Sequence, residues 1–245
     1  MKTWFKGGLM GKRMAQAGAV GMVLALAACG QRAPHATILY LRAREYGGAP
    51  YAERIFVNRR FVRIDPDMAT GNFILFNRKQ HVIYSVDTGD RTILVIHSHR
   101  FSYTAPMLLA NRVAKAPGVM EFEGHKALHY VLSTNGEQCY DLYAAKGFLP
   151  GPARALASYD RALAGEQAAA AEAGAPELQG PCDLADSVFS AGREYGQGFP
   201  IKMTDHDHNE KTLVRVRRDA AVALDTFTLP AHYLRYSPKE VRSGS

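Results

Sequence analysis

Hydrophobic and polar residues alternate along most of the chain in short runs, which is the pattern of β-strands. The first run spans residues 37–45, and the next ones span residues 54–57, 61–64, 72–77, 81–87 and 92–97. Short segments rich in Asn, Asp, Gly and Pro separate them, and such segments are typical of tight turns. Because these connections are too short for a crossover helix, the pattern predicts an antiparallel meander.

Two of these runs are apolar on both of their alternating faces. A strand of this kind cannot have one face in water along its whole length, so something must cover each face. These residues are the candidates for an apolar ligand face: Phe73, Ile74, Leu75, Phe76, Ile93 and Val95. A filled core and a ligand cavity use the same residue types, so both interpretations stay open.

The rest of the chain predicts one long helix and several shorter elements. The helix covers residues 153–173, where Leu156, Tyr159 and Leu163 recur at helical spacing. Short helices are predicted within 105–115 and around 183–193. Strands are predicted at 120–122, 126–134 and 138–144, then a hairpin of 199–205 and 211–218, and a last run at 221–229. The predicted fold class is therefore mainly β with few helices, in one mature domain.

The N-terminus has the pattern of an export signal. Residues 1–14 are basic, and residues 15–28 form an apolar stretch that would span about 21 Å as a helix, short of the roughly 30 Å of a bilayer core. The stretch ends in Leu26-Ala27-Ala28-Cys29, which resembles the lipobox of bacterial lipoproteins. The resemblance implies that Cys29 carries a diacylglycerol group and an N-acyl chain, and Gly30 after it implies sorting to the outer membrane. The alternative is an ordinary secretory signal with a chance cysteine.

Charge and cysteine content agree with export rather than with nucleic-acid binding. The chain has a net charge of +7, but Lys2, Lys6, Lys12 and Arg13 lie in the signal, and the 26 basic and 23 acidic residues that remain nearly balance. With Cys29 lipidated, Cys139 and Cys182 form one pair in an oxidising compartment, so a structural disulfide is predicted.

The order of these elements resembles uncharacterised bacterial envelope proteins whose strand order is similar to that of the LolA/LppX-like lipoprotein carriers. The resemblance covers roughly residues 37–236 and includes the ending Phe227-x-x-Pro230-x-x-Tyr233. It implies an unclosed antiparallel half-barrel with helices on its concave face. The resulting domain assignment is a signal peptide at 1–28, a lipidated tether at 29–36, the half-barrel at 37–236 and a tail at 237–245.

Candidate chemistry is sparse. His97 and His99 would point to one face of a strand, and a dense group of potential metal ligands stands in a predicted turn: Asp205, His206, Asp207 and His208. Exposed strand-end and turn residues explain both groups without a metal. The sequence contains no nucleophile elbow, phosphate-binding loop or zinc-protease helix.

These observations predict a non-enzymatic lipoprotein on the periplasmic face of the outer membrane, anchored by the lipid on Cys29. It needs no other cofactor, and its partners are the membrane and a lipid or other hydrophobic small molecule, with no nucleic acid. Two alternatives stay open. One is a structural or interaction lipoprotein that has a packed core and an envelope protein partner, and the other is a metal-binding envelope protein.

Overall fold

The computed structural model describes residues 32–243, so the signal and the predicted lipidation residue Cys29 lie outside the described residues. Residues from 33 onward form one compact unit. Its twelve strands are β1 His35–Arg44, β2 Tyr51–Val57, β3 Phe61–Asp65, β4 Phe73–Asn77, β5 Val82–Asp87, β6 Thr92–His97, β7 Asn111–Phe122, β8 His125–Thr134, β9 Glu137–Ala145, β10 Phe199–Asp205, β11 Glu210–Ala221 and β12 Leu234–Tyr236.

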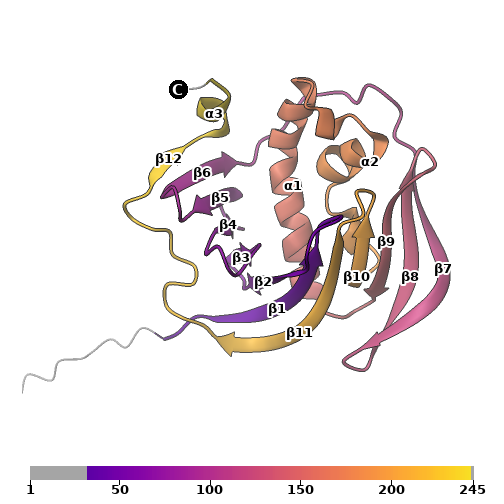
Figure 1. Ribbon diagram of the computed structural model, residues 1–245, viewed down its shortest axis with the longest axis horizontal. Coiled ribbons are helices and arrows are strands. Elements are labelled where there is room, and N and C mark those ends of the chain that lie inside the picture. The colour runs from indigo at the N-terminus through magenta and orange to yellow at the C-terminus, as the bar shows by residue number, and fades with distance from the viewer. Residues whose placement is uncertain (1–31, 244–245) are drawn as a thin grey trace, which may run out of the picture. The chain divides into compact units, whose positions relative to one another are not determined.

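The twelve strands form one sheet in the order β12-β6-β5-β4-β3-β2-β1-β11-β10-β9-β8-β7 (Figure 1). Neighbouring strands are antiparallel, except that β12 runs parallel to β6 at one edge. The pairing of β1 with β11 joins the N-terminal meander to the C-terminal hairpin. Because β12 and β7 end the sheet without pairing with each other, the sheet is unclosed, and the predicted fold class is confirmed.

Helix α1, Pro150–Glu172, lies against the concave face of the sheet (Figure 1). It begins three residues before the predicted start, with a proline in its first turn, where a missing N–H costs nothing. Its Leu156 and small alanines belong to the same core cluster as Val62, Phe76 and Ile83 of the sheet. The shorter helices that follow it are η1 Pro176–Leu178, α2 Pro181–Leu184, the π-helical turn η2 Ala185–Phe189 and η3 Arg193–Tyr195.

The outer face of β3–β6 is covered by an irregular segment, residues 222–233, here called the strap. Phe227, Leu229 and Tyr233 of the strap pack on the cluster formed by Phe73, Leu75, Val86 and Ile93. The ring of Phe227 stacks on that of Phe61, with 5.6 Å between the centroids. The prediction that something covers each face of the doubly apolar strands is therefore confirmed, with α1 on one side and the strap on the other.

Two local predictions are wrong. Residues 105–115 contain no helix, because Met107 and Leu108 are exposed and so bury no apolar face, and from Asn111 onward the chain pairs with β8. Residues 222–229 form no strand, because β11 ends at Ala221, where its partner β1 begins at His35.

The predicted tail contains helix α3, Pro238–Ser243, and its Arg242 pairs with Glu166 of α1 at 2.9 Å. No helix within residues 32–243 is long and apolar enough to cross a membrane.

Candidate functional site

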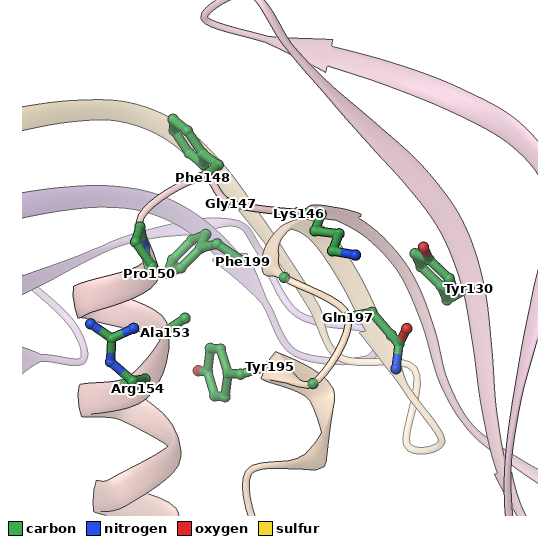
Figure 2. A pocket seen from close by; sticks show the side chains of 12 residues that line it. Tyr130, Lys146, Gly147, Phe148, Pro150, Ala153, Arg154, Tyr195, Gln197 and Phe199 are labelled. Atoms are coloured by element: carbon green, nitrogen blue, oxygen red, sulfur yellow. The ribbon is translucent and has the colours of Figure 1, made fainter.

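A pocket of about 350 Å³ opens between the first turns of α1 and strands β8 and β10 (Figure 2). The loop from β9 to α1 forms one wall, and the segment between η3 and β10 forms another. Four aromatic side chains line it, namely Tyr130, Phe148, Tyr195 and Phe199, together with Lys146, Arg154 and Gln197. This volume is in the range of small-molecule sites in proteins.

The backbone around the pocket depends on glycine at Gly198. Its φ of +126° is a conformation that other residues rarely adopt, and a Cβ there would lie 2.5 Å from the carbonyl oxygen of Ala145. The segment before β10 can therefore lie directly on the end of β9. This contact carries Gln197 and Phe199 to the pocket wall opposite α1.

The pocket combines apolar walls with positive charge. Phe199 contacts both Phe148 and Tyr195, with ring centroids 6.3 Å apart in each pair. Lys146 and Arg154 are exposed at the pocket and have no carboxylate partner among residues 32–243. The N-terminal end of α1, with no acidic residue in its first turn, adds a partial positive charge. The arrangement therefore favours a molecule with an apolar body and an anionic group.

A buried carboxyl pair, Asp160 of α1 and Glu194 of η3, lies deeper in the molecule, near Tyr195. Burial raises the pKa of Asp160 to about 7, and burial together with the nearby Asp160 raises the pKa of Glu194 to about 8. Asp160 Oδ2 and Glu194 Oε2 are buried and accept no hydrogen bond from a described donor. A proton held by one carboxyl group supplies the missing donor to the other.

Sequence reasoning missed this pair, although one signal was available. Asp160 stands four residues after Leu156 and three before Leu163, on the apolar side of the predicted helix. A carboxyl group in that position has to be buried by the sheet. Its partner Glu194 is 34 positions further along, in a short turn that the sequence pattern does not connect with α1.

The six predicted ligand-face residues divide between the two sides of the sheet. Ile74 and Phe76 pack in the core cluster beneath α1. The other four lie on the outer face beneath the strap, namely Phe73, Leu75, Ile93 and Val95. The pocket is lined by other residues, at the boundary between the helices and β8–β10.

His97, at the end of β6, and His99, just beyond it, belong to no group of metal-ligand atoms within residues 32–243. His97 is exposed at the end of the strand, and the Nδ1 atom of His99 lies 3.1 Å from the backbone oxygen of His97. The Nδ1 atom of His99 is also 3.9 Å from Glu166 of α1. The structure thus gives His99 a partner on the helix.

The second predicted metal group, residues 205–208, does not act as one cluster, and only His206 and Asp207 lie near a further potential ligand, Asp183. Asp205 accepts hydrogen bonds from Asn209 within the turn, and the ring of His208 packs against Tyr46. His206 Nε2 lies 2.7 Å from Asp183 of α2 and 3.9 Å from Asp207. The ligand atoms of Asp183, His206 and Asp207 all lie within 4.8 Å of one another.

The interaction with Asp183 changes the acidity of His206. Burial lowers the pKa of this imidazole, but the hydrogen bond and charge of Asp183, together with the charges of Asp207 and Asp205, outweigh burial, so the pKa stands above its ordinary value. The sequence did not identify Asp183 because it lies on another element, 23 positions away.

The disulfide explains how Asp183 reaches the turn. Cys139 and Cys182 are bonded, with 5.2 Å between their Cα atoms, so the predicted pairing is confirmed. The bond ties α2 to β9. Asp183, the next residue after Cys182, is thereby held beside the hairpin that carries His206.

Comparisons with known proteins assign no family to the chain. No family model and no curated protein matches it. Among solved structures, an uncharacterized conserved protein from Thermus thermophilus is similar over 82% of this chain and 90% of its own, with 10% identity and a TM-score of 0.42.

PNGF-II is similar in two crystal forms, over 86% of this chain, with 8% identity and TM-scores of 0.42 and 0.41. The similar region is about a third of the PNGF-II chain, at 32% and 33%. Identities and TM-scores this low assign no function.

Proposed function

We propose that this chain is a non-enzymatic lipoprotein of the bacterial envelope that binds an anionic amphiphile, such as a fatty acid or phospholipid. Cys29 would carry the anchor, as its resemblance to a lipobox implies, and the outer membrane would be its location. For the fold, we correspondingly propose that the chain is related to the LolA/LppX-like carriers. The observation that carries the binding proposal is the pocket in which four aromatic rings meet Lys146 and Arg154.

The chemistry of the pocket supports this ligand class. Aromatic walls gain free energy when they bury hydrocarbon, at roughly 25 cal/mol per Å² of apolar surface. Lys146 and Arg154 lack a carboxylate partner among the described residues, so an anionic headgroup would be their counter-ion. A neutral hydrocarbon would leave both cations without a counter-ion.

Titration with a dansyl-labelled fatty acid tests the proposal. We expect fluorescence enhancement with the wild type, at least tenfold weaker binding by the double variant Lys146→Glu/Arg154→Glu, and weaker binding of the methyl ester of the same probe. The double variant Arg235→Glu/Lys239→Glu reverses two exposed charges away from the pocket, so it is the matched control and should bind like the wild type. Equal binding of acid and ester by all three proteins would refute the proposal.

A second candidate is a structural or interaction lipoprotein with a packed core. It is favoured by the burial of the predicted ligand face, where Phe76 and Ile93 are both 0% exposed. If no amphiphile binds and no lipid co-purifies with the protein, this candidate is the one that stands.

A further inference from the structure

Five cations gather at one rim of the sheet, the rim where the chain enters at His35. Four short connections close this entry rim, at residues 58–60, 78–81, 123–124 and 146–149. They carry five cations, namely Arg59, Arg60, Arg78, Lys79 and Lys146, but only one carboxylate, Glu123. This carboxylate pairs with Arg218 at 2.8 Å.

The opposite rim has the reverse charge. Its connections are residues 45–50, 66–72, 88–91, 135–136 and 206–209. They carry the carboxylates Glu45, Asp67, Asp90 and Asp207 against one cation, Arg91. The compact unit is therefore electrically polarised along its strands.

Four of the five cations at the entry rim surround one hollow. Arg59 and Arg60 from the β2–β3 turn, and Arg78 and Lys79 from the β4–β5 turn, line a depression of about 600 Å³ beside Ser158 of α1. The Nη1 atom of Arg78 donates to the carbonyl oxygen of Asn58 at 2.8 Å and so joins the two turns.

The charge of this hollow is not neutralised from within. The charged groups of the Arg59, Arg60 and Lys79 side chains make no hydrogen bond or ion pair with any residue in 32–243. Burial and then the nearby charge of Arg154 lower the pKa of Arg78, as expected where like charges crowd together. Such a patch attracts an extended anionic surface.

The described part of the chain enters the sheet at this rim. Thr37 of β1 pairs with Val57 of β2, so the β2–β3 turn lies beside the point of entry. Only five residues lie between Cys29 and His35, so even a fully extended chain joins the two over at most about 20 Å.

We propose that the entry rim docks on the anionic phospholipid surface of the membrane, through Arg59, Arg60, Arg78 and Lys79. Docking would turn the pocket at Lys146, on the same rim, toward the bilayer. The orientation rests on the proposed lipid anchor at Cys29, but the affinity of the rim for anionic lipid does not.

Vesicle binding by residues 33–245 tests the surface without the anchor, since this unit contains the whole sheet, the helices and the disulfide. Vesicles of phosphatidylcholine with phosphatidylglycerol are compared with vesicles of phosphatidylcholine alone. Each cation near an anionic surface contributes about fivefold to affinity, so Arg59→Glu/Arg60→Glu should weaken binding at least about 25-fold. Raised salt should weaken binding by the wild type.

The matched control is Arg235→Glu/Lys239→Glu, which changes the net charge equally at exposed positions away from the hollow. It should bind vesicles like the wild type, and circular dichroism should show both variants folded. The proposal is overturned if the wild type binds neutral vesicles as tightly as anionic ones, or if the control variant loses as much vesicle affinity as Arg59→Glu/Arg60→Glu. It is also overturned if the wild type binds duplex DNA more tightly than anionic vesicles.

The two proposals fail separately. Arg59 and Arg60 do not line the pocket, so their variant should keep the wild-type affinity for the dansyl-labelled fatty acid. Loss of vesicle binding with probe binding retained supports the docking surface. If mass analysis finds no acyl group on Cys29 while vesicle binding persists, the anchor is wrong and the surface stands.

Discussion

Replacing the buried carboxyl pair with amides, as Asp160→Asn and Glu194→Gln, is expected to change how the stability of the fold depends on pH. Asp160 Oδ2 and Glu194 Oε2 are buried acceptors without a described donor. The raised pKa values of both groups mean that the folded wild type holds protons here, and these protons supply donors to the pair. An amide of the same shape supplies an N–H donor at every pH.

The magnitude follows from the raised pKa values of about 7 and about 8. The unfolded chain releases these protons near about pH 4, whereas the folded chain keeps them until near neutral pH. The pair therefore stabilises the fold most at low pH, and this contribution is lost as the pH rises toward the higher of the two folded-state values. Each proton held only by the folded state lowers the free energy of unfolding by about 1.4 kcal/mol for every unit that the pH rises. Between about pH 5 and about pH 7 this amounts to about 3 kcal/mol per proton.

Urea unfolding followed by far-UV circular dichroism, with the disulfide oxidised, measures this effect between about pH 5 and about pH 8. The difference in unfolding free energy between variant and wild type should move in favour of the variant as the pH rises. Glu172→Gln, an exposed carboxyl on the same helix, is the matched control and should show a constant difference.

Other groups also titrate in this range. Burial raises the pKa of Asp186 to about 6, and the pKa of His206 is raised as well. Their effects cancel in the comparison because they are present in every protein measured. If the double variant Asp160→Asn/Glu194→Gln keeps the pH slope of the wild type, the pair does not hold an extra proton and the reasoning is refuted.

Three further predictions concern other contacts. The disulfide closes a separation of 43 residues, so Cys139→Ser/Cys182→Ser should lower the unfolding free energy by about 4 kcal/mol, and urea curves like those of the oxidised wild type would contradict this. Phe227→Ala removes the ring that holds the strap and should cost about 2 kcal/mol, while Leu224→Ala, at a side chain 56% exposed, should cost little. The raised pKa of His206 means that its pair with Asp183 stabilises the fold below about pH 6.5 and is lost as the pH rises through the folded-state value. The advantage of the wild type over His206→Gln should shrink accordingly, and a pH-independent difference would exclude this pair as the cause.

The sequence by itself determined most of the strands, the long helix, and the need for a cover on both faces of the doubly apolar strands. Alternating residues predict strands because successive side chains point to opposite faces, and the doubly apolar run Phe73–Phe76 required a cover on each side. The pairing of Cys139 with Cys182 followed from the count of cysteines. The lipidation of Cys29 lies outside the described residues and stays a prediction.

Only the tertiary structure decided which residues meet across long separations. Alternation assigns Phe73 and Leu75 to one face and Ile74 and Phe76 to the other, but which face lies under α1 depends on packing elsewhere in the chain. The contacts of Asp160 with Glu194 and of His206 with Asp183 join separate elements, for which local periodicity carries no information. The charged rims arise in the same way, because antiparallel strands bring alternate turns to the same end of the sheet. Each turn contributes at most two charges, and only the fold brings the turns of like charge to the same rim.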